Sequence, residues 1–312
     1  MDLRAFECYV RGRVNDRLAR LLNRRAVSPS APLDPGDLLK ASRPGPLDYV
    51  RLLEGRSNAL RQAIVGQWLA AREFPVERIP YSTFEGRGEN VAVDLGGGAP
   101  TLILIGHHDA VPGSPGANDN ASAVAILLTV LERLSADPPR RFRVRVLFTG
   151  GEELGYLGAR CYVKTTPLER VIGVLSLELC GIGDSPAIWD AAPPYDAGPF
   201  LARLCGVLEE MGYRRDESYH VVGRIPVFGS DHRAFAALRV PAFGLTMVPG
   251  AEAESLRQFI RSPLRSAFRQ LVRRPAPFHT YHTAGDRLDT LEVGAMERAA
   301  AALCALVKDL DR

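Results

Sequence analysis

Five side chains of the kinds that bind divalent metals are spread along this 312-residue sequence, each in a short motif of its own. A pair of first-row cations such as Zn²⁺ needs about two imidazoles and three carboxylates, one of them shared, to hold the ions roughly 3.5–4 Å apart around a water. The sequence therefore predicts a hydrolase with two Zn²⁺ ions per chain. The candidate ligands are His107 in GHHDAV, Asp119 in PGANDNAS, Glu153 in TGGEELG, Glu178 in LSLELCG and His282 in YHTAGD.

Two of these motifs carry a second carboxylate with a different predicted role. Glu152 directly precedes Glu153, and adjacent residues at a strand-to-helix turn point in different directions. One can then bind metal while the other faces the attacking water as general base. Asp109 lies two residues after His107, on the same side of an extended chain, and is predicted to orient the imidazole rather than to bind metal.

Apolar runs in front of three motifs predict the strands that carry them. Residues 101–106 (TLILIG), 142–148 (FRVRVLF) and 171–179 (VIGVLSLEL) are rich in aliphatic side chains, which is typical of strands buried on both faces of a parallel sheet. Ligand sites in open α/β sheets form beyond the carboxyl ends of the strands. We therefore expect three of the ligands at one edge of a sheet. A carboxylate such as Glu178 inside an apolar strand is costly to bury without a cation.

Asp119 lies in a Gly/Pro/Asn loop, at the start of a helix predicted by apolar residues at helical spacing from Asn120 onward. Along the whole chain, predicted helices alternate with predicted strands. This alternation indicates an α/β fold of three layers, a mixed and mostly parallel sheet with helices on both faces. The helices are expected near 57–72, 120–135, 198–212 and 291–310, and the strands near 90–95, 101–106, 142–148, 171–179 and 241–247.

Residues 57–310 resemble the family-28 metallopeptidases, the zinc exopeptidases that include bacterial leucyl aminopeptidases and the glutamate carboxypeptidase II type, because all five motifs occur in that family's order. The resemblance implies two zinc ions that share Asp119, with Glu152 as the base. It implies one ion held by His107, Asp119 and Glu178, and the other held by Asp119, Glu153 and His282. The segment GSDHRAF (229–235) matches a further family landmark, where Asp231 and His232 are expected to shape the substrate pocket.

The preferred prediction is an aminopeptidase, and Glu178 keeps an alternative open. Many family aminopeptidases have Asp at this strand end, whereas Glu is associated in the wider group with carboxypeptidase substrates. A carboxypeptidase or an N-acyl amino-acid hydrolase is therefore the alternative, although the 103 residues between Glu178 and His282 leave little room for a separate lid domain. A one-metal glutaminyl cyclase-like acyltransferase and a non-catalytic binding module remain as further alternatives, and neither would need the full set of ligands.

The composition, 46% hydrophobic, is enough for one large α/β core. We predict one catalytic domain over 57–312, with an N-terminal helix and Pro-rich linker (1–56) packed on it. Five Cys without C-x-x-C spacing favour a reducing compartment and argue against both a disulfide framework and a Cys-based zinc site. Because no run has the length and apolarity of a signal or membrane-spanning segment, a cytoplasmic location is predicted.

The resemblance implies a peptide or small amide as substrate. The net charge is only +3, so neither nucleic acid nor membrane is predicted as a partner. The oligomeric state does not follow from the sequence. Residues 1–26 carry seven Arg against three acids in a predicted amphipathic helix. Between 257 and 274 a second set of Arg recurs every four residues, and we hypothesise that it lines the pocket and favours acidic groups in the substrate.

Overall fold

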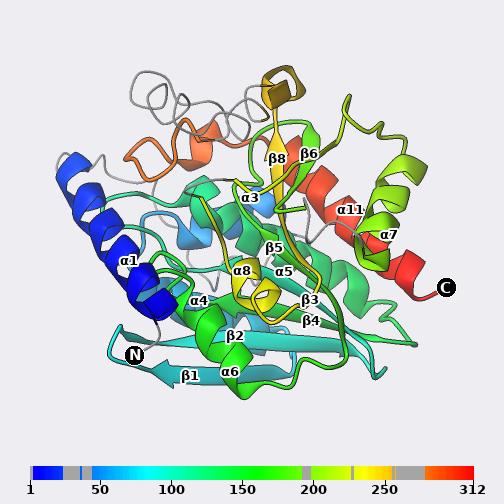
Figure 1. Cartoon of the computed structure of the whole chain (residues 1–312), viewed down its shortest axis with the longest axis horizontal. Helices are drawn as coiled ribbons and strands as arrows, with labels where there is room; N and C mark the ends of the chain where they lie inside the picture. Colours follow the sequence, from blue (N-terminus) through cyan, green and yellow to red (C-terminus); the bar gives the residue numbers. More distant parts are fainter. Residues whose placement is uncertain are drawn as a thin grey trace.

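The computed structural model describes residues 3–23, 36, 44–191, 198–225, 228–254, 257 and 278–312. In this part of the chain, helices cover both faces of a central twisted sheet (Figure 1). The helices are α1 (Leu3–Leu22), α3 (Pro46–Leu53), α4 (Asn58–Ala71), α5 (Ser122–Ser135), α6 (Leu157–Thr165), α7 (Pro199–Glu210), α8 (His232–Ala236) and α11 (Val293–Leu310). The strands are β1 (Val76–Ser82), β2 (Arg87–Gly96), β3 (Thr101–His107), β4 (Arg143–Thr149), β5 (Val171–Leu177), β6 (Ser185–Trp189), β7 (His220–Val221) and β8 (Ala242–Val248).

The sheet is mixed, with the strand order β1-β2-β4-β3-β5-β8-β6-β7. Its centre, β4-β3-β5-β8, is parallel, whereas β1, β2 and β6 join their neighbours β2, β4 and β8 in antiparallel pairs. The register pairs His107 with Thr149, so β3 and β4 end at the same level. Parallel pairing thus brings the carboxyl ends of the central strands to one edge, as the three-layer α/β prediction requires.

Side chains along the central strands alternate between two hydrophobic cores. In β3, Leu102 and Leu104 belong to one core, and Ile103 and Ile105 belong to the other. Because successive strand residues point to opposite faces, a continuous aliphatic run supplies both cores at once. Burying each such side chain contributes about 1.5–3 kcal/mol. The continuous aliphatic run of β3 is therefore explained by burial of both faces of the sheet.

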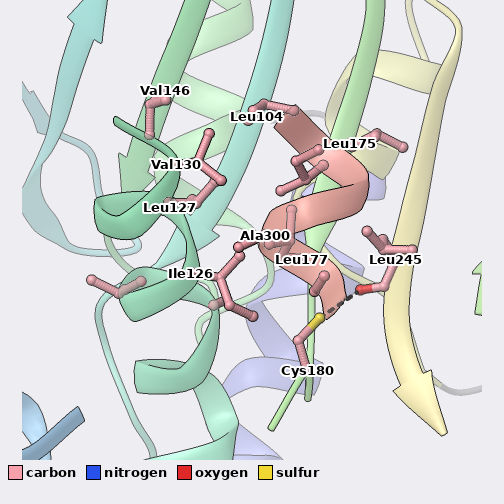
Figure 2. Packing of buried hydrophobic residues seen from close by; sticks show 14 of the residues in the cluster. Leu104, Ile126, Leu127, Val130, Val146, Leu175, Leu177, Cys180, Leu245 and Ala300 are labelled. Carbon is pink, nitrogen blue, oxygen red and sulfur yellow. Dashed lines mark hydrogen bonds between the residues drawn. The ribbon is translucent and has the colours of Figure 1, made fainter. Parts of the chain in front are cut away.

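The larger core lies between the sheet and α3, α4, α5, α7 and α11, and the smaller one lies under α6 and α8. Figure 2 shows part of the larger core, which includes Leu104 of β3, Val130 of α5 and Ala300 of α11. Cys180 is buried at its margin, and its thiol donates to the backbone oxygen of Leu245 (3.3 Å). This side chain has the core position that a small buried thiol usually takes.

All nine elements predicted from periodicity are present. The sequence did not predict β1, β6 and β7, because β1 (VERIPYS) is half-exposed at the sheet edge, β6 contains Pro186 and β7 has two residues. The helix in 1–26 is confirmed over Leu3–Leu22. Within 1–56, α3 buries Tyr49, Val50, Leu52 and Leu53 in the larger core, while the boundary at 56 stays a prediction.

Among the helices described, none combines the length and apolarity needed to cross a bilayer. This finding does not test the predicted cytoplasmic location, which stays a prediction.

Candidate metal centre and active site

The first candidate ligand, His107, is the last residue of β3 and is 1% exposed. Its Nδ1 lies 3.0 Å from the backbone oxygen of Asp109, which favours an N–H at Nδ1 and leaves Nε2 free to bind a metal. Nε2 lies 3.3 Å from Asp119 Oδ1 and 3.4 Å from Glu178 Oε2. The end of β3 therefore presents an imidazole nitrogen to a cluster of carboxylates.

Asp109 is buried and its carboxylate contacts two parts of the site. Oδ1 lies 3.5 Å from His107 Nδ1 and accepts the backbone N–H of Glu152 (3.1 Å), while Oδ2 accepts that of Glu153 (3.2 Å). Burial opposes ionisation, but the imidazole of His107 and the N–H of Glu152 lower the pKa of Asp109 to about 2. The geometry suits the predicted role of orienting His107, and it adds a role that the sequence did not indicate: orienting the Glu152–Glu153 turn.

The pair Glu152 and Glu153 occupies the turn after β4, where Gly151 has a φ of +68° that favours glycine. The two carboxylates have different neighbouring imidazoles, but both reach the centre, because His107, Glu152 and Glu153 offer ligand atoms within 4.8 Å of one another. Glu153 Oε2 lies 2.9 Å from His282 Nε2, whereas Glu152 Oε2 lies 3.9 Å from His107 Nε2. Burial raises the pKa of Glu152 well above its ordinary value, with His107 acting in the opposite direction. A raised pKa suits a group that must both accept and return a proton.

Glu178 directly follows β5, and its N–H donates to Leu245 O of β8 (2.9 Å). The hydroxyl of Ser230 donates to Glu178 Oε1 and lies 2.8 Å from the hydroxyl of Ser176. Burial raises the pKa of Glu178, against the attraction of His107. One carboxylate oxygen is thus held by a hydroxyl, and the other faces the imidazole.

Two ligands, Asp119 and His282, come from loops rather than from strand ends. The buried carboxylate of Asp286 accepts the N–H groups of Asn118 (2.7 Å) and Asp119 (3.0 Å), which ties the two loops together. His282 has a φ of +59°, and its ring stacks on Tyr281 with centroids 3.7 Å apart. His282 Nε2 lies 3.3 Å from Asp119 Oδ2. A hydrogen-bonding carboxylate therefore positions the loop ligands.

The five candidate ligands form two groups that share Asp119, and within each group the ligand atoms lie within 4.8 Å of one another. A third group meets the same distance and joins His107 and Glu153 with Glu152. The inner group is His107, Asp119 and Glu178, all buried; the outer group is Asp119, Glu153 and His282, of which the last two are partly exposed. Asp119 Oδ2, Glu153 Oε1 and His282 Nε2 are buried atoms without a hydrogen-bond partner. Two cations would satisfy them and offset the repulsion among the carboxylates, and the donor set suits Zn²⁺.

Two other residues singled out in the sequence, Asp231 and His232, lie next to this centre and in neither group. Thr149 at the end of β4 donates its hydroxyl to Asp231, and burial raises the pKa of Asp231 to about 7. His232 Nε2 lies 3.1 Å from Asp190 Oδ2, and its ring meets Trp189 edge-on. Both side chains therefore pack behind the edge that carries the ligands.

Other sequence features lie apart from the centre. His279, close to His282 in the chain, is exposed and belongs to neither ligand group. All five cysteines are free thiols. Of the Arg set between 257 and 274, Arg257 is described, and it pairs with Asp216 at 2.5 Å. The rest of that set lies outside the described residues.

The sequence interpretation did not assign two residues that position the site. Asp286 stands four residues after His282 inside the quoted YHTAGD motif. The sequence therefore contained this carboxylate in a recognised motif, but it did not show which groups the carboxylate would bind. Arg61 is fully buried in α4 and donates to the backbone oxygens of His108 (2.5 Å) and Gly116 (3.1 Å). A single arginine in an amphipathic helix carries no such signal, because its acceptors are brought to it only by folding.

A small hollow opens onto the centre beside Glu152. Its walls come from the Glu152–Tyr156 turn, from Phe228, Gly229 and Tyr281, and from Arg11 and Asn15 of α1, and its free volume is about 20 Å³. That volume holds about one water molecule. In the view of Figure 1, α1 runs along one side of the molecule beside this edge.

The comparison with protein families identifies one match: the model for Peptidase family M28 matches residues 90–307. Among curated proteins, endoplasmic reticulum metallopeptidase 1 of Mus musculus is 30% identical over 47% of this chain and 17% of its own length. Leupeptin-inactivating enzyme 1 of Streptomyces exfoliatus is 30% identical over 51% of this chain and 35% of its own. The chain thus spans a minor part of the curated relatives that it matches.

Among solved structures, a zinc aminopeptidase from Bacillus subtilis superposes with a TM-score of 0.56 at 19% identity, covering 74% of this chain and 52% of that one. Glutaminyl cyclase from an Acidobacteriales bacterium superposes with a TM-score of 0.62 at 18% identity, covering 91% and 97%. At these identities the likeness shows the shared fold.

Proposed function

This chain belongs to peptidase family M28, and from that membership and the geometry of the site we propose that it is a zinc-dependent exopeptidase, specifically an aminopeptidase, with two Zn²⁺ ions per chain. The proposed metal ligands are His107, Asp119, Glu153, Glu178 and His282. The observation that carries the proposal is the pair of ligand groups sharing Asp119, with the carboxylate of Glu152 beside them.

When bound, the zinc ions supply positive charge that makes an attacking water more acidic and favours negative charge on the scissile carbonyl oxygen. The residues of the chain supply the proton transfers. Glu152 takes a proton from the attacking water onto a carboxylate oxygen and returns it to the leaving nitrogen as the peptide bond breaks. Asp109 holds the Glu152 N–H, which keeps this carboxylate in place during both transfers.

The supporting residues keep the site dry and aligned. Tyr281 is partly buried and stacks on His282, and burial together with the surrounding carboxylates raises the pKa of its hydroxyl well above 10, so the phenol stays neutral. Asp286 holds the Asp119 loop, and Ser230 holds Glu178. Each ligand therefore has a partner that limits its motion, which is how metal sites maintain their geometry.

A glutaminyl cyclase-like acyltransferase is the second candidate, since a solved cyclase covers nearly the whole of this chain at 18% identity. The complete ligand set favours the hydrolase, because a one-metal acyltransferase would not need both ligand groups. A carboxypeptidase or N-acyl amino-acid hydrolase would use the same proton transfers with a different substrate terminus. The number of zinc ions per chain distinguishes the cyclase from the aminopeptidase. The substrate terminus that must be free distinguishes the carboxypeptidase and the N-acyl amino-acid hydrolase from it.

The test is hydrolysis of a small peptide panel by zinc-loaded protein, with free or acetylated amino termini and free or amidated carboxyl termini. Loss of cleavage on acetylation is the expected result for an aminopeptidase. Cleavage of acetylated peptides that depends on a free carboxylate would replace this proposal by a carboxypeptidase. Cyclisation of N-terminal glutamine peptides without any hydrolysis, at one zinc per chain, would replace it by the cyclase.

A further inference from the structure

Helix α1 docks directly on the loops that carry the metal centre. A Cβ atom placed on Gly12 would lie 2.7 Å from Leu154 Cα, so the helix approaches the turn after Glu153 at a distance that only glycine allows. Near the other end of the helix, the Asn23 side chain donates to the backbone oxygens of Pro112 (3.3 Å) and His282 (3.1 Å). This N-terminal element is therefore a wall of the active site.

Arg11 is the residue of α1 that faces the general base. It lines the small hollow together with Glu152, donates a hydrogen bond to the hydroxyl of Tyr156, and lies 5.1 Å from the centroid of that ring. Burial acts to lower its pKa, but Tyr156 and Glu152 raise it, and the net direction is upward, so the guanidinium stays charged. Within the described part of the chain, Arg11 forms no ion pair with a carboxylate. A cation thus faces the reacting groups with a neutral acceptor as its partner.

The chemistry of the leaving group indicates which part of the substrate would lie near the Arg11 guanidinium. If Glu152 returns the proton to the leaving nitrogen, that nitrogen must come within hydrogen-bond distance of its carboxylate. The nitrogen and the α-carboxyl carbon of one amino acid are separated by two bonds of about 1.5 Å each. When the leaving residue is the last of the chain, its carboxylate therefore lies close to Glu152 and needs a positive partner.

We propose that Arg11 binds the α-carboxylate of the leaving amino acid, so that dipeptides are the preferred substrates. This inference rests on the proposed function, in particular on Glu152 as the proton carrier. An arginine fork and a carboxylate form two parallel charge-assisted hydrogen bonds, which are stronger than the present bond to a neutral phenol. The hollow holds about one water, so the long Arg11 side chain swings from Tyr156 as the leaving residue enters.

The experiment compares Leu-Phe with Leu-Phe-NH₂, as the first members of a dipeptide panel, on wild type and Arg11→Gln. Glutamine keeps a donor for the Tyr156 hydroxyl and removes the charge. We expect wild type to prefer the free acid, and Arg11→Gln to lower kcat/KM for Leu-Phe by about 10- to 100-fold, mainly through KM, as for a lost hydrogen bond to a charged group. Cleavage of the amide, which has no carboxylate for Arg11 to bind, should fall much less than cleavage of the acid. Inhibition by free phenylalanine should weaken by the same factor.

Arg17→Ala on the exposed side of the same helix is the matched control, and it should leave both rates unchanged. Arg11→Lys, which keeps the charge without the fork, should recover part of the preference. If Arg11 only tethers α1, Arg11→Gln would lower both rates equally, and the inference is wrong. Wild type that cleaves acid and amide equally would overturn the inference alone, whereas wild type that cleaves no peptide would overturn the proposed function itself.

Discussion

The inner and outer ligand groups share one carboxylate but are built in different ways. In the inner group, His107 ends β3 and Glu178 follows β5, so the hydrogen-bond register of adjacent parallel strands sets their separation. In the outer group, Glu153 lies in a turn and His282 in a loop with a left-handed backbone. The inner ligands therefore depend on the sheet, and the outer ligands depend on side-chain hydrogen bonds to the loops.

This difference indicates which metal ligands can be displaced more easily. Moving an inner ligand requires a change in a buried sheet, which close packing resists. Moving an outer ligand requires the loss of a few hydrogen bonds, such as those that Asp109 and Asp286 accept from the loops. Loops open at lower free-energy cost than core strands. We therefore expect the outer metal ion to bind more weakly and to leave first.

The largest effect should come from Asp119→Asn, because both groups use this carboxylate. With the shared ligand weakened, both ions and the acidified water are lost, and kcat/KM should fall by at least about 10⁴-fold. Metal analysis and peptide hydrolysis measure the change. Asp137→Asn, on an exposed residue, is the control. One ion retained at full affinity would show that Asp119 is not shared.

The next effect isolates proton transfer from metal binding. Glu152→Gln should lower kcat by about 10²- to 10⁴-fold while two zinc ions remain bound, because all five proposed ligands are unchanged in this variant. Steady-state kinetics and the metal content are read on the same preparation. Glu169→Gln changes an exposed carboxylate and should be neutral. Near-normal turnover in Glu152→Gln would contradict its role as base.

The comparison of the groups is tested directly by His282→Ala and His107→Ala. We expect His282→Ala to keep one zinc against a chelator that removes the other, and His107→Ala to lose the more tightly bound ion. In wild type the outer ion should bind at least about tenfold more weakly, because fewer buried partners hold its ligands. His279→Ala changes an exposed neighbour and serves as control. Simultaneous release of both ions from wild type would remove the distinction.

The smallest effect concerns the metal-free protein. Burial and the charge of Asp119 raise the pKa of Asp286 to about 7, above the value near 3.9 of an unfolded Asp. A raised folded pKa gives stability that is complete below the unfolded value and is lost as the pH rises through about 7. With chelator present, the Tm should therefore rise by about 2–4 °C for each kcal/mol gained between pH 8 and pH 5.

Asp286→Asn should flatten that profile, because one of the groups that takes up a proton is gone, while Asp289→Asn at an exposed site should leave it unchanged. A wild-type Tm that falls steadily on acidification in the presence of chelator would contradict this electrostatic account. The zinc-loaded protein should behave in the opposite way, since protons compete with metal for the ligands.

Much of the fold followed from local pattern. The sequence predicted the elements whose apolar residues have the spacing or the continuous run typical of one type of secondary structure. These are strands β3, β4, β5 and β8 and helices α4, α5, α7 and α11. Edge strand β1 and the short helix α8 lack a clear apolar periodicity, so their secondary structure depends on tertiary contacts. Four of the proposed ligands stood out because each follows or precedes a strong element, whereas His282 stood out by the place of its YHTAGD motif in the order of the family's motifs.

The sequence by itself determined which residue types occupy the ends of the central strands and the motifs around them, because alternation and apolar runs are properties of neighbouring residues. Only the tertiary structure decided what depends on residues far apart: Asp286 under the Asp119 loop, Asp109 under the Glu152–Glu153 turn and Arg11 of α1 beside Glu152. The physical reason is that a hydrogen bond or an ion pair acts over a few ångströms, and only folding brings such residues within that range.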